Sequence, residues 1–416
     1  MTQITLTPDQ QKVKSTFTQF ILNPNEKKLV IAGYAGTGKS TLTRILIEEL
    51  PKTLKTANLI NNTDKYWDIQ LTATTNKAAE ALSFLVGAPV STIQSFLGLR
   101  VQTDIKTKET RLVPTRATSD VFDTILFIDE ASYIDYSLLK IINQLTVNCK
   151  VIFMGDPAQL TPVKCSTTPV FDQGYNTSEL TEVVRQAAGN PIIDLATKFR
   201  ETVNTGKFFS FTPDNHHIRH IPRDQFEKEL LADFSDPNWK TNTSKLLAWT
   251  NKTVIKYNHA INDVIKGTPK LSVGDYAVCN KYIRTSRCHL RTDQLVCITS
   301  IKSNPELVFG VSGCIVGMDD RHYAFFPDNL EDRNRAYKKA RANEKWDEAH
   351  HISENWIDLR AAYACTINKS QGSTYDRVYI DLDDVKKCRN SNSLARMLYV
   401  AVSRARDKVI FTGDLV

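Results

Sequence analysis

The chain has 416 residues, of which 41% are hydrophobic and 24% are charged. This length and composition exclude a disordered or fibrous protein, and they allow about two to four domains whose cores need no cross-links. The formal net charge of +7 favours a polyanionic partner whose phosphates it could neutralise, although many basic proteins bind no nucleic acid.

The cysteines and the N-terminal residues bear on the cellular compartment. The eight cysteines show no C-x-x-C pair and no Cys/His cluster at metal-ligand spacing, so we expect reduced thiols in buried or half-buried places. They are Cys149, Cys165, Cys279, Cys288, Cys297, Cys314, Cys365 and Cys388. Residues 1–5 lack the basic and apolar regions of a signal peptide, and no apolar run approaches the length that spans a bilayer. These features predict a soluble, cytoplasmic protein.

The first half of the chain alternates short apolar runs with helical patterns. The strand-like runs are residues 28–32, 69–73, 125–128 and 151–154, and the helical patterns are residues 39–50 and a helix from residue 76. Such alternation predicts an α/β fold with a parallel sheet that helices cover on both faces. Within residues 98–116, two β-prone runs flank a polar stretch and predict a protruding hairpin. The alternative is a surface hairpin without a function.

A second α/β pattern begins near residue 180 and is interrupted by an insertion. Short β-runs between residues 271 and 327 predict a small all-β barrel, and residues 331–356 form a charged segment that favours helix. The charges in that segment alternate in sign, which favours a solvated face over a binding stripe. The α/β pattern resumes with strands at 377–382 and 408–412 around a helix at 393–403. The predicted division is residues 1–179 including the hairpin at 98–116, then 180–267, the insert at 268–356, and 357–416.

Residues 33–40 fit the pattern G-x-x-x-x-G-K-[ST] between a strand-like run and a helix, which is the setting that a phosphate-binding P-loop requires. Glycines let the backbone wrap phosphates with its N–H groups, and the helix N-terminus adds the positive end of its dipole. Lys39 is expected to reach the β- and γ-phosphates, and Ser40 to ligate Mg²⁺. The predicted nucleotide contacts are Gly33, Tyr34, Ala35, Gly36, Thr37, Gly38, Lys39, Ser40 and Thr41. The loop alone does not separate one class of P-loop NTPase from another.

Polar residues follow two further apolar runs. Asp129 and Glu130 end the run at 125–128, where a parallel sheet would bring them beside the P-loop. Asp129 is expected to hold Mg²⁺ through water and Glu130 to polarise the attacking water; the alternative is a solvated pair at a strand end. Gln159 follows the run at 151–154 and is placed to sense the γ-phosphate, although the Gly-Asp-Pro sequence before it is also what a plain turn requires.

Together these features resemble superfamily 1 helicases, and most of the chain is similar to the Dda-like and RecD-like members of group B. Residues 6–10 resemble the Q motif, which implies that Gln10 recognises adenine. Residues 180–186 and 398–406 resemble motifs IV and VI. This resemblance implies that Arg185 and Arg404 are arginine fingers, which stabilise the charge on the transferred phosphate only when two lobes close. Without the family context, a surface salt bridge explains either arginine equally well.

Residues 363–374 resemble motif V, and residues 75–77 and 91–95 resemble the two segments of the first lobe that touch the DNA backbone. The resemblance implies that Gln371 and Gly372 lie near the nucleotide and that short polar side chains contact phosphates without reading sequence. The implied DNA contacts are Thr75, Asn76, Lys77, Ser91, Thr92, Gln94, Ser95, Thr366, Asn368 and Lys369. Thr74 replaces a usual proline, Gln94 and Asn368 a common histidine, and Ser403 a usual threonine. These departures concern strand handling and not hydrolysis.

The resemblance also implies an architecture and an activity. It implies two RecA-like P-loop NTPase lobes that use ATP and Mg²⁺, move 5′ to 3′ on single-stranded DNA and unwind duplex at single-strand/double-strand junctions. The hairpin would be a pin that splits the duplex, and residues 268–356 an SH3-like barrel that braces it, although no aromatic stands at the hairpin tip to stack on bases. The implied protein is a monomer without membrane contact that works with replication or recombination proteins, including a single-strand binding protein, in the host cytoplasm if phage-encoded.

Two other functions remain open. One is a nucleotide-gated protein that clamps single-stranded nucleic acid, or moves along it, without unwinding. The other is a small-molecule kinase or another P-loop phosphotransferase, which shares only the elements around Lys39 and Asp129. A catalytic glutamate with two arginine fingers disfavours the clamp, and the doubled lobe pattern disfavours the kinase.

Overall fold

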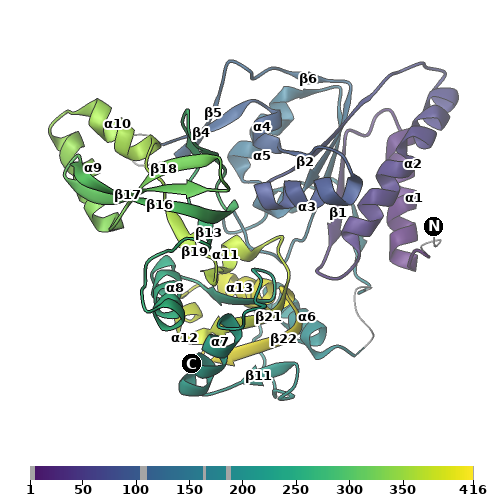
Figure 1. Cartoon of the computed structure of the whole chain (residues 1–416). Coiled ribbons are helices and arrows are strands. Elements are labelled where there is room, and N and C mark those ends of the chain that lie inside the picture. Colours follow the sequence, from purple (N-terminus) through teal and green to yellow (C-terminus); the bar gives the residue numbers. More distant parts are fainter. Residues whose placement is uncertain (1–4, 104–109, 163–164, 184–188, 416) are drawn as a thin grey trace. The chain divides into compact units, whose positions relative to one another are not determined.

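The computed structural model describes residues 5–103, 110–162, 165–183 and 189–415, drawn in Figure 1. The chain divides into two units, each of which is described by itself. Unit 1 contains Met1–Phe211 and Asn390–Ser403, and unit 2 contains Thr212–Arg389 and Arg404–Val416. The sequence predicted a domain boundary after residue 179. Unit 1 instead continues to Phe211 and also includes Asn390–Ser403. This last segment contains the helix that precedes Arg404.

Unit 1 is built on a six-stranded, all-parallel sheet in the order β10-β1-β9-β7-β2-β3. Its strands are β1 (Lys28–Gly33), β2 (Asp68–Ala73), β3 (Ser91–Thr92), β7 (Thr124–Asp129), β9 (Lys150–Gly155) and β10 (Asn176–Leu180). The central strands β1, β7 and β9 are almost wholly buried, as expected for a parallel sheet covered on both faces. The predicted strands at 28–32, 69–73, 125–128 and 151–154 and the α/β class are therefore confirmed.

Two hydrophobic clusters lie against this sheet. One contains Phe17 of α1 and Leu46 of α2, and the other contains Ile93 of α4 and Leu139 of α5. The helices are α1 (Pro8–Leu22), α2 (Lys39–Asn61), α3 (Asn76–Val86), α4 (Ile93–Phe96), α5 (Tyr136–Leu145), α6 (Pro191–Thr205) and α13 (Ser391–Ser403). Two 3₁₀ turns, η1 (Ala131–Tyr133) and η2 (Pro169–Asp172), complete the unit. Helices α1 and α2 lie side by side (Figure 1).

Helix α2 is longer than the predicted helix at 39–50. It continues through Pro51 to Asn61, although an interior proline removes one backbone hydrogen bond and disfavours helix. Leu50 and Ala57 are buried in the core and Leu54 packs against it, so tertiary packing on both sides of Pro51 outweighs that local cost. The predicted end of this helix at residue 50 is therefore too early.

The predicted hairpin is present as an antiparallel pair of strands, β4 (Leu99–Thr103) and β5 (Thr110–Pro114). Its base is held by the Gly98 carbonyl oxygen, which accepts hydrogen bonds from the hydroxyls of Thr115 and Thr118 at 2.6 and 2.8 Å. The hairpin tip, where the sequence lacks an aromatic, falls on residues 104–109 and lies outside the described residues. A second, parallel pair joins β6 (Val121–Phe122) to β8 (Thr146–Val147).

Unit 2 contains a five-stranded parallel sheet in the order β11-β22-β21-β12-β20. Its strands are β11 (Ile218–His220), β12 (Ser244–Ala248), β20 (Ala364–Thr366), β21 (Tyr375–Asp381) and β22 (Ala405–Thr412). Its helices are α7 (Arg223–Phe234), α8 (Asn251–Lys266), α11 (Ile367–Ser370) and α12 (Leu382–Val385). The α/β pattern predicted for the second half is confirmed.

The predicted β-rich insert forms an antiparallel sheet in the order β18-β17-β16-β13-β19. Its strands are β13 (Tyr276–Cys279), β16 (Leu295–Val308), β17 (Val311–Met318), β18 (His322–Pro327) and β19 (Leu359–Ala361), with a small pair β14 (Ile283–Arg284) and β15 (His289–Leu290). The charged segment forms α9 (Leu330–Ala342) and α10 (Trp346–Glu354). The fully buried Trp356 packs on Phe325 with ring centroids 4.7 Å apart, which ties the segment after α10 to β18.

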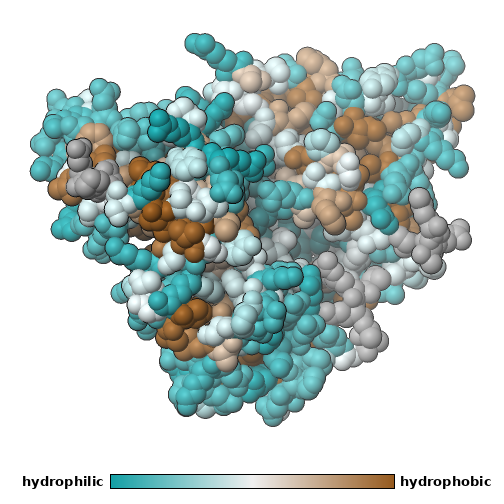
Figure 2. Space-filling view, viewed as in Figure 1, coloured by the Kyte–Doolittle hydropathy of each residue, from teal (hydrophilic) through white to brown (hydrophobic). Residues whose placement is uncertain are grey.

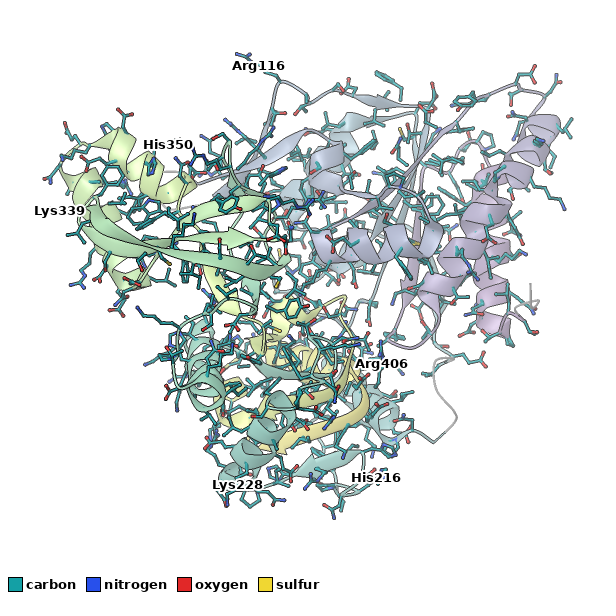
Figure 3. The ribbon with its side chains drawn as sticks, in the orientation of Figure 1. Arg116, His216, Lys228, Lys339, His350 and Arg406 are labelled. Carbon is teal, nitrogen blue, oxygen red and sulfur yellow. The ribbon has the colours of Figure 1, made fainter. Side chains whose placement is uncertain are left out.

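The charged side chains of α9 and α10 are exposed or partly exposed to solvent, as the alternating charges in this segment predicted. Lys339 on α9 and His350 on α10 project from the ribbon (Figure 3), and Arg335 pairs with Asp332 within α9. The face in Figure 2 is mostly hydrophilic, with hydrophobic groups in separate patches. Among the described residues, no helix is both long and apolar enough to cross a membrane.

Candidate functional site

The carboxyl ends of four strands of unit 1 meet at one edge of its sheet. The register pairs Ala73 with Asp129, Ile128 with Phe153, and Ala32 with Gly155. The residues that follow β1, β2, β7 and β9 therefore emerge together, which is where ligands bind in open parallel sheets. They are the P-loop, the segment from Thr74, the carboxylate pair and the turn at 156–159.

The P-loop has the backbone geometry that its glycines allow. Gly36 and Gly38 adopt φ values of 83° and 75°, in the left-handed region that favours glycine. A Cβ on Gly33 would lie 2.7 Å from Cγ of Lys39, so the side chain of Lys39 occupies space that only glycine leaves open. The Lys39 ammonium donates hydrogen bonds to the carbonyl oxygens of Gly33 and Tyr34. Lys39, Ser40 and Thr41 lie in the first turn of α2, as the motif predicts.

Gln10 is buried against the P-loop. Its amide nitrogen donates to the carbonyl oxygen of Thr37 over 3.2 Å, and its amide oxygen accepts from the backbone N–H of Thr7. Thr7 caps α1 in return, because its hydroxyl accepts from the N–H of Gln10. Gln10 thus joins the start of α1 to the phosphate loop. Its role in recognising adenine stays a prediction.

Asp9, next to Gln10, anchors the segment that leads toward Arg185. One carboxylate oxygen accepts from the N–H and hydroxyl of Thr181 at 2.8 and 2.7 Å and from the N–H of Glu182 at 3.0 Å. These hydrogen bonds, the Thr181 hydroxyl first, lower the pKa of Asp9. Arg185 itself lies outside the described residues, so its place as an arginine finger stays a prediction.

Asp129 and Glu130 stand at the end of β7. An oxygen of the Asp129 carboxylate accepts from the N–H of Glu130 over 2.9 Å. Burial raises the pKa of Asp129, and the Glu130 N–H and the charge of Lys39 oppose that rise. Glu130 has φ 54°, an uncommon conformation for a residue with a side chain, and such conformations gather at functional sites. The backbone there is held by Thr74, whose N–H and hydroxyl donate to the carbonyl oxygens of Asp129 and Glu130 at 3.1 and 2.8 Å.

The turn after β9 presents Gln159. Asp156 is fully buried, and one of its carboxylate oxygens accepts from the N–H of Ala158 over 2.9 Å. The carbonyl oxygen of Asp156 accepts from the N–H of Gln159 over 3.2 Å. Asp156 therefore shapes the turn, and Gln159 is itself 3% exposed. A turn without a function would account for Asp156, but it would not account for the buried side-chain amide of Gln159.

Two residues of α13 contact this turn and were not assigned a role from the sequence. The Tyr399 hydroxyl donates to the second carboxylate oxygen of Asp156 over 2.5 Å and accepts from the P-loop N–H of Ala35 over 2.9 Å. Arg396 donates to the carbonyl oxygens of Pro157 and Gln159, both at 2.6 Å. The available signal was their spacing of three residues, which places both on one helix face just before Arg404.

In unit 2, the two arginines that end the motif VI pattern differ sharply. Arg404 is 7% exposed, and its guanidinium donates to the carbonyl oxygen of Ser373 over 3.4 Å. Arg406 is exposed and pairs with Asp376 at 3.0 Å (Figure 3). The buried Arg404 therefore lies beside the motif V pattern, where Gln371 is also buried. Gly372, the next residue, has φ 73°.

The three predicted DNA-contact segments share one local form. Thr75, Thr92 and Thr366 each cap the N-terminus of a helix, because their hydroxyls accept from the N–H three residues later at 3.2, 3.2 and 3.4 Å. Thr92-Ile-Gln in unit 1 and Thr366-Ile-Asn in unit 2 even repeat the same sequence pattern at the end of a short strand. Each unit thus carries an equivalent strand-to-helix turn, which a search for fixed-period repeats does not find.

The other predicted DNA contacts lie on or beside these turns. Asn76 and Lys77 open α3, and Ser91 begins β3. Gln94 and Ser95 lie in α4, and Asn368 and Lys369 lie in α11. The ammonium of Lys369 donates to Asn280 and pairs with Asp293 at 2.7 Å, within the insert of unit 2. Its charge is thus shared with an acidic partner that the sequence did not reveal.

Two family profiles match the chain. The AAA domain family matches residues 5–223, more than half of the chain, and the UvrD-like helicase C-terminal domain matches residues 361–412. The first match covers the P-loop, the carboxylate pair and Gln159. The second covers the motif V and motif VI patterns.

One relative and two solved structures resemble the chain over nearly its whole length, and a second relative resembles part of it. The ATP-dependent DNA helicase Dda of Enterobacteria phage T4 is 27% identical, over 96% of this chain and 98% of the relative. The ATP-dependent RecD2 DNA helicase of Deinococcus radiodurans is 32% identical, over 40% of this chain and 21% of the relative. Pif1 helicase from Bacteroides, with ADP-AlF3 and single-stranded DNA, has a TM-score of 0.53 at 18% identity, covering 100% of this chain and 94% of the other. Pif1 from Candida albicans has a TM-score of 0.52 at 19% identity, covering 99% and 95%. These two structures support the fold alone.

Proposed function

We propose a mechanism of directed movement for this chain, which belongs to the AAA-domain helicases of superfamily 1, in the group of Dda, Pif1 and RecD. It is an ATP-dependent DNA helicase. Its proposed activity is movement 5′ to 3′ along single-stranded DNA, driven by Mg²⁺-dependent hydrolysis of ATP, with unwinding of duplex at junctions. Family membership removes the small-molecule kinase as an alternative.

One observation carries the proposal: Thr74 links the carboxylate pair to a predicted DNA contact. Its N–H and hydroxyl donate to the carbonyl oxygens of Asp129 and Glu130, and the next residue is Thr75, which caps α3. If contact with a DNA phosphate displaced the start of α3, Thr74 would therefore pull on the polypeptide backbone at Glu130. This connection offers a direct route by which bound DNA would stimulate hydrolysis.

Each residue of the site has a proposed role in hydrolysis. The P-loop amides and Lys39 hold the phosphates, Glu130 polarises the attacking water, and Gln159 senses the γ-phosphate. Arg404 and Arg185 supply positive charge to the transition state when the lobes close, and this conditional step couples turnover to movement. Gln10, Gln371 and Gly372 complete the proposed nucleotide site.

The donor set fits Mg²⁺ in the form of Mg-ATP. Mg²⁺ retains several waters and takes one or two protein oxygens together with phosphate oxygens. Two protein ligands are therefore enough for a site of this kind. Ser40 opens α2, and Asp129 ends a strand whose carboxyl end meets that of β1 at the same edge. Ser40 and Asp129 would hold the ion, which when bound neutralises charge developing on the phosphates.

The DNA path is proposed to follow the equivalent turns of the two units. Thr75 and Thr92 in unit 1 and Thr366 in unit 2 would contact phosphates, which positions a strand without reading its sequence. The hairpin β4–β5 is the proposed pin, and residues 268–356, which supply four of the five strands of the antiparallel sheet, are the proposed SH3-like brace. We propose a monomer that acts with replication or recombination proteins, including a single-strand binding protein, in the host cytoplasm if the chain is phage-encoded.

The test uses two partial duplexes that differ only in whether the single-stranded tail is 5′ or 3′. With ATP and Mg²⁺, the expected result is unwinding of the 5′-tailed duplex alone. Glu130→Gln should abolish unwinding while retaining DNA binding, and the exposed Glu80→Gln on α3 is the matched control that should remain active.

Other outcomes of this test are equally clear. DNA-stimulated hydrolysis without unwinding would leave a translocase or a nucleotide-gated clamp. Preference for the 3′ tail would overturn the proposed polarity. Hydrolysis that ignores single-stranded DNA would overturn the coupling through Thr74.

A further inference from the structure

The hydroxyl of Tyr399 joins two separate parts of the nucleotide site. It accepts from the N–H of Ala35 in the P-loop and donates to the carboxylate of Asp156, so both of its hydrogen-bonding functions are used. Tyr399 is 2% exposed and Asp156 is fully buried. Hydrogen bonds to a buried carboxylate are strong, because the acceptor is charged and water does not compete.

The Ala35 contact is unusual in a P-loop. The N–H groups of such a loop ordinarily point toward phosphates, whereas this N–H donates to a side-chain hydroxyl of a helix 364 residues further along the chain. The position of Tyr399 therefore depends on the conformation of the loop. A nucleotide that reshapes the loop must either keep this hydrogen bond or break it.

Arg396 makes the second connection between α13 and the turn of Gln159. Its guanidinium donates to the carbonyl oxygens of Pro157 and Gln159, so it holds the backbone on both sides of Ala158. Burial lowers the pKa of Arg396, and the charges of Asp156 and Asp172 oppose this. Asn392 on the same helix donates to the carbonyl oxygen of Val203 in α6 over 3.0 Å, which fixes the helix at its other end.

Helix α13 ends at Ser403, and the next residue is Arg404. A rotation or slide of α13 is thus passed along the backbone to the proposed arginine finger. One face of α13 contacts the P-loop and the turn that carries Gln159. The C-terminal end of α13 leads directly to Arg404, which would stabilise the transition state.

We propose that Tyr399 and Arg396 are positioning residues that hold the Ala35 amide and the Gln159 turn in register with α13, so that the nucleotide state of unit 1 sets the placement of Arg404. This inference rests on the proposed ATP hydrolysis and adds the element that transmits it. Neither residue touches the reacting atoms. Loss of the Tyr399 hydroxyl should therefore slow turnover without preventing ATP from binding.

The competing explanation is a core tyrosine that contributes only to folding. Unit 2 contains a matched control, because the buried Tyr379 donates its hydroxyl to a carboxylate oxygen of Asp233 over 2.6 Å. Both Tyr→Phe changes remove the hydroxyl that donates to a carboxylate, which is buried for Asp156 and half-buried for Asp233, and both leave the ring in place. They should cost similar stability, and only Tyr399→Phe should alter catalysis.

The experiment measures kcat and KM for ATP at saturating single-stranded DNA, the ATP consumed per base pair unwound, and unfolding in urea, for the wild type and each variant. Tyr399→Phe should lower kcat by about 10-fold or more, change KM by less than about 3-fold, and raise the ATP consumed per base pair. Tyr379→Phe should keep kcat within about 2-fold of wild type. Equal kcat values for the two variants would overturn the inference.

Arg396 keeps the inference testable if Tyr399→Phe fails to fold. Arg396→Lys retains a cation that can donate to both carbonyls, whereas Arg396→Met cannot, so Met should lower kcat and Lys should restore most of it. Equal activity of Met and wild type would count against the proposal. Failure of the proposed function is distinct, because then the wild type would not hydrolyse ATP or Glu130→Gln would hydrolyse it normally.

Discussion

Thr74 donates its hydroxyl to the carbonyl oxygen of Glu130 over 2.8 Å, and in doing so holds the proposed catalytic residue in a left-handed backbone conformation. The family pattern usually has proline at this position, which has neither a hydroxyl nor an N–H to donate. This chain therefore secures the end of β7 with two hydrogen bonds that proline cannot form. We therefore expect the departure at Thr74 to affect hydrolysis as well as strand handling.

The contribution of Thr74 can be separated from general stability. Thr74→Val keeps the shape of the side chain and removes only the hydroxyl, so we expect a loss of about 1–2 kcal/mol of stability and a fall of about 10-fold in DNA-stimulated kcat. The matched control is Thr72→Val, because the Thr72 hydroxyl in β2 donates to the Phe127 carbonyl oxygen in β7 over the same 2.8 Å, two residues before Thr74. It should lose similar stability and keep its activity. Equal kcat for both variants would show that Thr74 has no special role.

Gly98 at the base of the hairpin tests the proposed pin. It has φ 66°, and an added Cβ would lie 2.7 Å from backbone atoms of Ala117 and Thr118. Gly98→Ala should therefore displace the hairpin base and reduce unwinding several-fold more than single-strand-stimulated hydrolysis. Gly87→Ala is the control, since Gly87 has φ 67° and nothing within 4 Å of the added Cβ. If unwinding and hydrolysis fall together in Gly98→Ala, the hairpin is not a dedicated pin.

Lys150 tests what holds α1 to the sheet of unit 1. Its ammonium donates to the carbonyl oxygens of Phe20, Asn23 and Glu26 at 2.7, 2.7 and 2.9 Å. Lys150→Met leaves these acceptors without their donor and should destabilise the protein by about 3 kcal/mol in urea unfolding. The exposed Lys27→Met should change stability by less than about 0.5 kcal/mol.

The same lysine gives a pH dependence with a definite sign. Burial lowers the pKa of Lys150 to about 8 from its ordinary 10.5, so the side chain is still charged at pH 7. Between these two values the unfolded chain binds more protons than the folded chain, and the contribution to stability therefore rises with pH. The stability difference between wild type and Lys150→Met should increase from pH 8 to pH 10.5. A stability difference that stays constant across this pH range would contradict the lowered pKa of Lys150.

Removal of Mg²⁺ tests the proposed ion site. Chelation by EDTA should abolish hydrolysis, and excess Mg²⁺ should restore it, because the ion neutralises the phosphates. Asp129→Asn should require a higher Mg²⁺ concentration for half-maximal activity. The control is Asp123→Asn, since Asp123 precedes the same strand at its other end and pairs with Lys65 at 2.8 Å. An unchanged Mg²⁺ requirement in Asp129→Asn would remove Asp129 from the site.

Much of the fold followed from local patterns. The strands predicted at 28–32, 69–73, 125–128, 151–154, 377–382 and 408–412, the hairpin and the β-rich insert appear close to their predicted positions, because buried strands are continuous apolar runs between helical patterns. The short strands β3, β11 and β20 were not predicted. Two expectations differed from the structure. Helix α2 continues past Pro51 because its later residues pack into the core, and unit 1 extends past residue 179 and includes α13. In both cases contacts distant in sequence outweighed a local signal.

The sequence by itself determined the P-loop, the carboxylate pair and the caps at Thr75, Thr92 and Thr366, since each depends on residues only a few positions apart. Only the tertiary structure decided which distant side chains support them. The hydrogen bonds from Thr74 to Glu130 and from Tyr399 to Asp156 join residues 56 and 243 positions apart. The physical reason is that a buried polar group must find a partner wherever the fold supplies one, and neither composition nor spacing records that choice.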